Sequence, residues 1–160
     1  MTEHEIHDIC KKYNINNYTI NPDGSIDVRG NVSIVEYDIN YIPIKFNKVG
    51  GWFNCSGMSL TSLKGCPKKV DGNFYCHKNE LTSLKGSPES VRGSFDCSNN
   101  KLTTLKGCPN GVGVYFLFNY NNLISLDGFN NNYDKLFCDN KENLIKKHKR
   151  SKKLKLIEKL

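Results

Sequence analysis

The chain repeats a 21-residue pattern three times almost without change. The copies begin at Phe53, Phe74 and Phe95, and each carries Phe-x-Cys, Leu-x-x-Leu, Gly-x-Pro and Val at constant offsets. A fixed period of about 20–30 residues with leucines in register is typical of a solenoid, in which each unit buries its apolar side against the next. The pattern therefore predicts a repeat architecture with a broad exposed surface.

Weaker copies extend the register in both directions. One period of 21 residues after the third copy lies a fourth copy, which has phenylalanine in place of the cysteine. One period before the first copy lies a copy that keeps only the apolar positions. Their apolar and glycine positions are Phe116, Phe118, Leu123, Leu126 and Gly128, and Val32, Ile34, Ile39, Ile42 and Val49. A last fragment at residues 136–138 restarts the strand motif one residue early. We expect five units over residues 30–134, an N-terminal cap made of a helix and a hairpin at 1–29, and a C-terminal cap with a basic tail at 135–160.

Each unit predicts one short strand and an extended return. The alternation in Phe-x-Cys places Phe74 and Cys76 inward and Tyr75 outward. Proline in the Gly-x-Pro segment cannot continue a helix, so we expect a polyproline-like path along the convex side. An asparagine recurs at one turn position, as Asn79, Asn100 and Asn121, and a stack of them would pair backbone groups that are otherwise buried. The predicted fold is a β-rich repeat solenoid with short parallel strands.

The motifs resemble leucine-rich repeats, and the order Pro-x-x-Val, Phe-x-Cys-x-x-Asn-x-Leu-x-x-Leu is most similar to the short bacterial-effector class. The repeats and the segment YTINPDGSIDVRGNVSI before them resemble leucine-rich-repeat-like proteins of tailed phages and other large DNA viruses, which carry near-copies of CxxNxLTSLKGCPKxV and a similar lead-in. Met58 in the first asparagine position and Phe118 for cysteine depart from that pattern. The resemblance covers about residues 15–140, and it implies the solenoid fold and a viral lineage.

Charge is concentrated at the C-terminal end. Residues 1–140 contain 14 basic and 14 acidic side chains, whereas residues 141–160 contain nine basic and two acidic ones. The net charge of +7 therefore belongs to the tail, and the repeat body is neutral. A nucleic-acid-binding role for the whole fold does not follow from the average charge.

The seven cysteines do not form a disulfide pattern. Cys55, Cys76 and Cys97 occupy an inward column, where thiols act as small hydrophobic groups. Cys66 and Cys108 are two rungs apart, or about 10 Å, which is too far for a disulfide. With an odd total, no signal peptide and no membrane-length apolar run, we expect a reduced cytoplasmic protein, in the host cytoplasm if it is viral.

No catalytic or metal motif stands out. His4, His7 and Cys10 form an H-x-x-H-x-x-C pattern, but Thr2 and Glu5 make a capping box that predicts a helix over residues 3–13. That helix does not bring the three side chains onto one face, so a cap helix is favoured over a metal site. We expect a monomer that is not an enzyme and that uses no cofactor or metal.

Outward strand positions supply the candidate protein-binding residues. Aromatic side chains framed by small polar ones are typical of a binding hot spot. The alternative is that Trp52 packs under the N-terminal cap and that Tyr115 and Leu117 pack under the C-terminal segment. The candidate residues on this concave face are Trp52, Asn54, Tyr75, His77, Asp96, Tyr115 and Leu117.

The tail supplies a second candidate surface. A basic segment followed by leucines predicts an amphipathic helix that either caps the last rung or also binds a polyanion, which is nucleic acid, an anionic membrane surface or an acidic protein. Its candidate residues are Lys146, Lys147, Lys149, Arg150, Lys152 and Lys153. The sequence thus favours a non-enzymatic module that binds a protein partner, with a host protein as the expected partner of a viral factor. Polyanion binding and a structural role in the virion are the alternatives.

Overall fold

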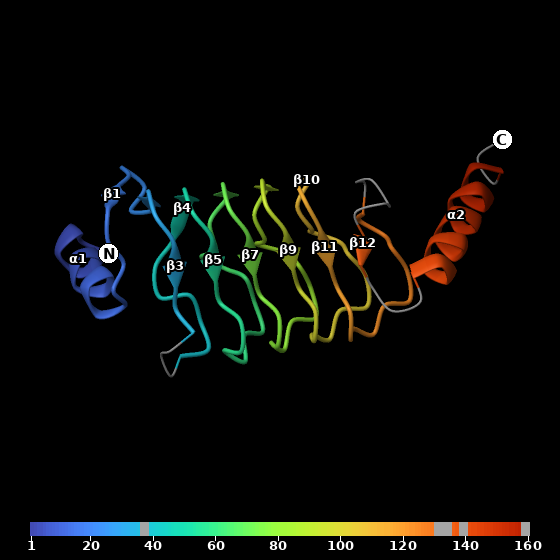
Figure 1. Cartoon of the computed structure of the whole chain (residues 1–160), viewed down its shortest axis with the longest axis horizontal. Helices are drawn as coiled ribbons and strands as arrows, with labels where there is room; N and C mark the ends of the chain where they lie inside the picture. The colour runs from blue at the N-terminus through green and yellow to red at the C-terminus, as the bar shows by residue number, and fades with distance from the viewer. Residues whose placement is uncertain (36–38, 130–135, 138–140, 158–160) are drawn as a thin grey trace.

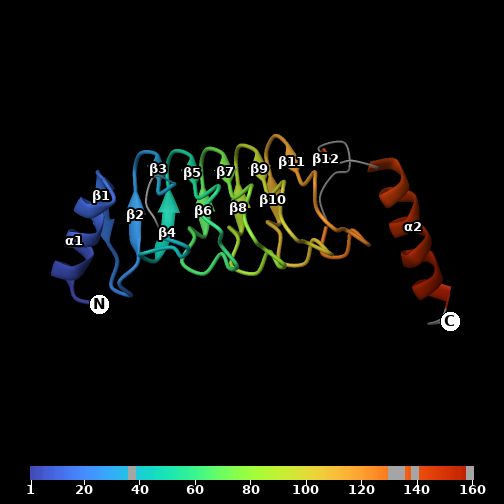
Figure 2. The ribbon, with the colours of Figure 1, turned by 90° about the horizontal axis from the view of Figure 1, so that it is seen from below.

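The computed structural model describes residues 1–35, 39–129, 136–137 and 141–157. They form a β-solenoid with a helix at each end (Figure 1). The fold class predicted from the repeat is confirmed, including the short parallel strands and both terminal helices. In two perpendicular views the rungs follow one another in a nearly straight row (Figures 1 and 2), so the expected concave face lacks the marked curvature of a horseshoe.

The Phe-x-Cys segments form one six-stranded parallel sheet. Its strands are β3 (Val32–Ser33), β5 (Phe53–Asn54), β7 (Phe74–Tyr75), β9 (Phe95–Asp96), β11 (Phe116–Leu117) and β12 (Leu136–Phe137). Phe53 pairs with Phe74, and Phe74 with Phe95, so the register steps by one repeat. Leu136 pairs with Phe116, which confirms that the motif restarts one residue early. We call the outer side of this sheet the strand face.

A second six-stranded sheet runs along the other side, and the sequence did not predict it. Its strands are β1 (Tyr18–Ile20), β2 (Ile26–Val28), β4 (Phe46–Val49), β6 (Lys69–Val70), β8 (Ser90–Val91) and β10 (Gly111–Val112). The prediction of a polyproline-like path for the return segment was therefore only partly correct. The chain is extended after the proline, but its last two residues pair with neighbouring rungs. β1 and β2 form the expected hairpin, and β2 joins the parallel strands through β4.

The core consists of stacked columns between the two sheets. The phenylalanine rings from Phe53 to Phe116 lie nearly parallel, with centroid separations of 5.5, 5.3 and 5.1 Å. Cys55, Cys76 and Cys97 form the next column and are fully buried. Leucines and valines at the repeated positions close the core. This is the expected rung-by-rung burial, in which every unit needs its neighbours.

The asparagine ladder predicted from the turns is present. Asn100 donates through Nδ2 to the carbonyl oxygens of Cys76 and Cys97, at 3.0 Å each. Its Oδ1 accepts from the Leu81 amide at 3.0 Å. Asn79 and Asn121 make the equivalent bonds. Each amide thus joins two rungs and satisfies backbone groups that water does not reach.

Both ends of the solenoid are covered by helices. α1 (Glu3–Lys12) has the predicted Thr2–Glu5 capping box, and it buries Ile6 and Cys10. The His4 side chain is exposed on the opposite side. α2 (Lys141–Ile157) packs Leu144 and Ile145 partly against the core.

Candidate functional site

Aromatic side chains reach solvent on the strand face. Tyr115 is 49 % exposed and Trp52 is 36 % exposed. They occupy one outward column, three rungs apart, or about 14 Å along the sheet at the usual strand spacing. Neither ring is fully buried by a cap. Leu117, in contrast, is only partly exposed, next to the final strand pair.

Tyr75 occupies the middle of the strand face in a fixed orientation. The Nδ2 atom of Asn73 donates to its hydroxyl at 2.7 Å. Its ring lies nearly perpendicular to the His77 ring, with centroids 6.2 Å apart and an interplanar angle of 84°. Because both ends of the ring are held, Tyr75 offers a preformed surface and loses little side-chain entropy on binding.

His77 and Asp96 join neighbouring rungs beside this tyrosine. His77 Nδ1 lies 3.4 Å from Asp96 Oδ2, without the geometry of a hydrogen bond. The other carboxylate oxygen of Asp96 accepts from the Ser98 amide at 2.9 Å. His77 Nδ1 is thus a buried polar atom that has no hydrogen-bond partner within the described structure.

Asn54 has a local structural role. Its Oδ1 accepts from the Ser56 amide at 3.0 Å and from the Ser56 hydroxyl at 2.7 Å. These bonds close the turn after β5 in the way that asparagine commonly does. The sequence therefore placed Asn54 on the correct face, but much of its bonding capacity is used within its own rung.

Three polar residues hold the backbone of the strand face, a role that sequence reasoning did not assign to them. Asn31 Oδ1 accepts from the Trp52 amide at 3.0 Å, and Asn73 Oδ1 accepts from the Ser94 amide at 2.8 Å. The Ser94 hydroxyl accepts from the Tyr115 amide at 3.3 Å. A small polar residue every 21 positions in the tryptophan–tyrosine column was the available signal. These bonds fix the backbone that carries both exposed rings.

The tail residues lie on α2, whose first half contacts the repeat body. The His148 side chain is 2 % exposed, and its Nδ1 lies 3.7 Å from Asp127 Oδ1. The basic residues Lys146, Lys147, Lys149 and Arg150 are exposed. Lys152 and Lys153 also belong to α2, but their side chains lie outside the described residues. α2 therefore combines a capping contact with a basic exposed surface.

Cys76 and Cys97 of the inward column are poor nucleophiles. Burial raises the pKa of the Cys76 and Cys97 thiols well above its usual value. At Cys108, which is less deeply placed, burial raises the pKa to about 11. Since the thiolate is the reactive form, native-state thiol chemistry is suppressed at neutral pH. The six cysteines that the structure describes form no disulfide with one another, and Cys138 lies outside the described residues.

Within the described residues, no three His, Cys, Asp or Glu side chains are placed to hold a metal ion. None of the described helices is long and apolar enough to cross a membrane. In comparisons with known proteins, no family model, curated protein or solved structure matches the chain.

Proposed function

We propose that this protein is a non-enzymatic binding module that engages a protein partner through the strand face. The observation that carries the proposal is the exposure of Trp52 and Tyr115 at the two ends of one column, with the immobilised Tyr75 between their rungs. Large aromatic anchors on a rigid backbone are typical of interface hot spots. The sheet bonds and side-chain bonds that hold these rings are already formed, so binding requires little ordering of the backbone.

The residues around the anchors fit an interface of mixed polarity. Asp96 and His77 are part-buried, with side chains 20 % and 30 % exposed. A partner group that donates to the Asp96 carboxylate would add a hydrogen bond at this partly exposed acidic group. Leu117 adds an apolar contact beside Tyr115. The resemblance noted in the sequence adds the proposal that the module is a viral factor and that its partner is a host protein in the cytoplasm.

The test compares two matched surface variants in affinity capture from host lysate with quantitative mass spectrometry. In the strand-face variant, Trp52, Tyr75 and Tyr115 are changed to Ala. In the control, the exposed Lys68 and Lys69 of the opposite side are changed to Ala. Truncating a central aromatic anchor typically costs about 2 kcal/mol or more, and a rim charge about 1 kcal/mol or less. The proposal expects a partner that the control retains and the strand-face variant loses; a partner lost only by the lysine variant contradicts it.

Polyanion binding through α2 is the second candidate function. Its support is that Lys146, Lys147 and Arg150 are exposed on α2. Other residues of the same helix, Leu144, Ile145 and His148, contact the end of the solenoid. Such binding should weaken steeply as salt increases, whereas aromatic-anchored protein binding should not. Salt dependence therefore separates the two candidates.

A further inference from the structure

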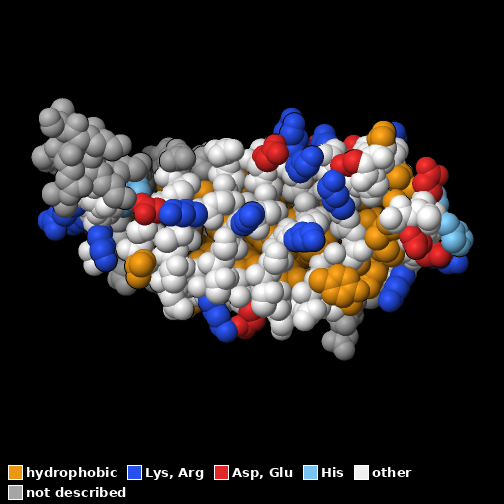
Figure 3. Space-filling model, turned by 180° about the vertical axis from the view of Figure 1, so that it is seen from behind, with side chains coloured by type: hydrophobic (Ala, Val, Ile, Leu, Met, Phe, Trp, Pro, Cys, Tyr) orange, Lys and Arg blue, Asp and Glu red, His pale blue; other side chains and the backbone are white. Residues whose placement is uncertain are grey.

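A row of lysines crosses three rungs outside the strand face. Lys64, Lys85 and Lys106 occupy the same position in successive repeats, and all three side chains are exposed. Figure 3 shows Lys and Arg side chains following one another along the back of the molecule. We call these three residues the lysine row. At the usual rung spacing the row is about 10 Å long.

The backbone beneath the lysine row is fixed. The hydroxyls of Ser62 and Ser83 accept from the amides of Lys64 and Lys85, at 3.2 Å each, and Thr104 makes the equivalent bond at 3.5 Å. The glycine after each lysine has a φ angle between +84° and +95°, a conformation that favours glycine. The three lysines therefore project from identical rigid turns.

Nothing described in the fold requires lysine at these positions. Other lysines of the repeat body form ion pairs, such as Lys48 with Asp71 and Lys45 with Asp23. Within the described residues, no acidic group lies within ion-pair distance of the lysine row. Three unpaired charges at this spacing repel one another by an amount on the order of 1 kcal/mol per adjacent pair before salt screening. An anionic ligand would relieve that repulsion.

Lysine is kept in three successive rungs and is replaced by Asp127 in the fourth, whereas a neighbouring column already changes within those three rungs. The column that contains Lys68 changes to Glu89 and then Asn110 in the next two rungs. Threonine is also constant beside the row, as Thr61, Thr82 and Thr103, and its three side chains are exposed. Over these three rungs the repeats have thus diverged at one solvated column and kept ammonium and hydroxyl groups at another, which Asp127 and Ile124 replace in the fourth rung. Those are the donors that phosphate oxygens accept.

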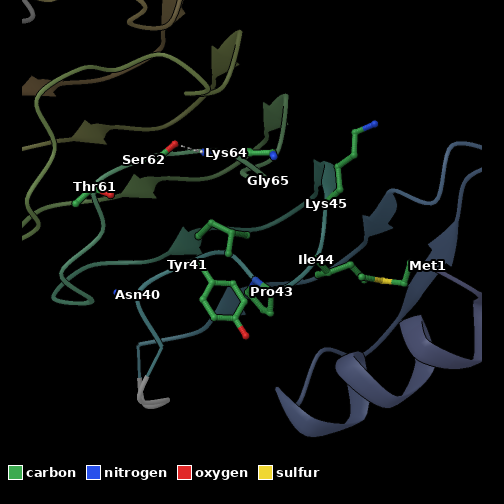
Figure 4. Close-up of a pocket in the computed structure, with 11 residues that line it drawn as sticks. Met1, Asn40, Tyr41, Pro43, Ile44, Lys45, Thr61, Ser62, Lys64 and Gly65 are labelled. Atoms are coloured by element: carbon green, nitrogen blue, oxygen red, sulfur yellow. Dashed lines mark hydrogen bonds between the residues drawn. The ribbon is translucent and has the colours of Figure 1, made fainter.

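An aromatic pocket opens at one end of the row. Lys64 lines this cavity of about 470 Å³ together with Tyr41, Pro43 and Ile44, as Figure 4 shows. Tyr41 is 57 % exposed. The volume falls in the range of about 300–1,000 Å³ that is usual for small-molecule sites. Because Lys64 belongs to both features, the pocket and the lysine row form one continuous surface.

We propose that this surface binds a single-stranded nucleic acid, with phosphates along the lysine row and one base against Tyr41. A positive track combined with an aromatic stacking platform is the usual design for single strands. A row one lysine wide follows one backbone rather than the two of a duplex. An extended acidic peptide would neutralise the lysines, but it would bring no planar group to the Tyr41 pocket.

The test measures fluorescence anisotropy with labelled oligothymidylate and oligouridylate of about ten nucleotides, a length typical of such sites. All proteins are full-length and carry K146Q/K147Q/R150Q, so that α2 does not mask the result. The row variant is K64Q/K85Q/K106Q, and the matched control K11Q/K12Q/K78Q removes three exposed charges elsewhere. Three phosphate contacts predict a salt slope of about −2, or roughly a 20-fold loss of binding between about 50 and 200 mM salt. The row variant should lose that dependence, and the control should keep it.

The pocket is tested separately by substitutions of Tyr41. Y41L should weaken oligonucleotide binding by about 5- to 150-fold, because one base loses its stacking partner. Y41F keeps an aromatic ring and should bind as tightly as the parent protein. Equal binding by the row variant and its control would overturn the proposal. A second outcome would also overturn it: an oligoglutamate peptide binds as tightly as the oligonucleotides, and Y41L binds like Y41F. The surface would then be a general anion site.

Discussion

Single residues show how the repeat turns polar and thiol groups into structural parts. Asn100 and Cys76 illustrate the two cases, an amide that pairs buried backbone groups and a thiol that fills space. Both roles were readable from the sequence, because a residue that recurs every 21 positions on an inward or turn column must meet its own copy in the next rung. The exact partners of Asn73 and Tyr75 were not readable, since that hydrogen bond depends on side-chain orientation on an exposed face.

We predict that Asn100→Ala destabilises the protein by about 3 kcal/mol or more. The change leaves the Leu81 amide and two buried carbonyl oxygens without their partner, and each unsatisfied group costs about 1–3 kcal/mol. Urea denaturation followed by circular dichroism measures the effect. Asn110→Ala is the control, because Asn110 is exposed, and it should change stability by about 0.5 kcal/mol or less. Equal effects of the two substitutions would show that the ladder adds no stability.

We predict that Cys76 is structural and unreactive. Cys76→Ala should reduce the free energy of unfolding by about 1–2 kcal/mol, because it removes a packed thiol from a central rung. In the native protein, a thiol reagent should modify Cys76 far more slowly than the partly exposed Cys108. Mass spectrometry of the labelled peptides distinguishes the two sites. Labelling of Cys76 as fast as that of Cys108 would refute a purely structural role.

At the scale of elements, the sequence predicted strands where side-chain periodicity is strong and missed them where it is weak. Phe-x-Cys alternates clearly, so the strands of the strand face were expected. The second sheet was missed because Lys69, Ser90 and Gly111 are not typical strand residues. Their pairing comes from the stacking of rungs, and no single segment contains that information.

We predict that the tight turns tolerate no side chain at the repeated glycine. A Cβ atom at Gly107 would lie 2.8 Å from the Lys85 backbone nitrogen, and its φ angle is +84°. Gly107→Ala should therefore destabilise by about 2 kcal/mol or more. Gly111 has open space around its Cβ position, so Gly111→Ala should change stability by about 0.5 kcal/mol or less. Thermal unfolding of the two variants provides the comparison, and a Gly107 variant as stable as the Gly111 variant would contradict the turn geometry.

We predict that the cap and the charge of α2 are separable. K146Q/K147Q/R150Q should leave the melting temperature unchanged, because these side chains are exposed, but it should reduce salt-sensitive retention on heparin. His148→Ala should lower the melting temperature, because the ring is buried against the end of the repeat body. A truncation that spares this contact must therefore begin after Arg150. Unfolding of the charge variant would show that the lysines themselves hold the cap.

At the scale of the whole molecule, one stacked core supports two chemically different surfaces. The strand face carries exposed aromatic rings with fixed polar neighbours. The opposite side carries an ion-pair network, in which Lys48 and Arg92 lower the pKa of Asp71. The neutral repeat body and the basic tail were evident from composition. Which outward residues remain accessible was not, because it depends on how far the two terminal helices cover the last rungs.

Site-specific photo-crosslinking tests the central claim, that the strand face is the protein-binding surface, most directly. Benzoylphenylalanine replaces Tyr115 on the strand face in one protein and the exposed Glu89 on the opposite side in another. Both proteins are irradiated with the partner captured by the unmodified chain, and crosslinked peptides are identified by mass spectrometry. We expect the partner to crosslink at position 115 and not at position 89. Efficient crosslinking at position 89 with none at position 115 would show that the partner binds elsewhere.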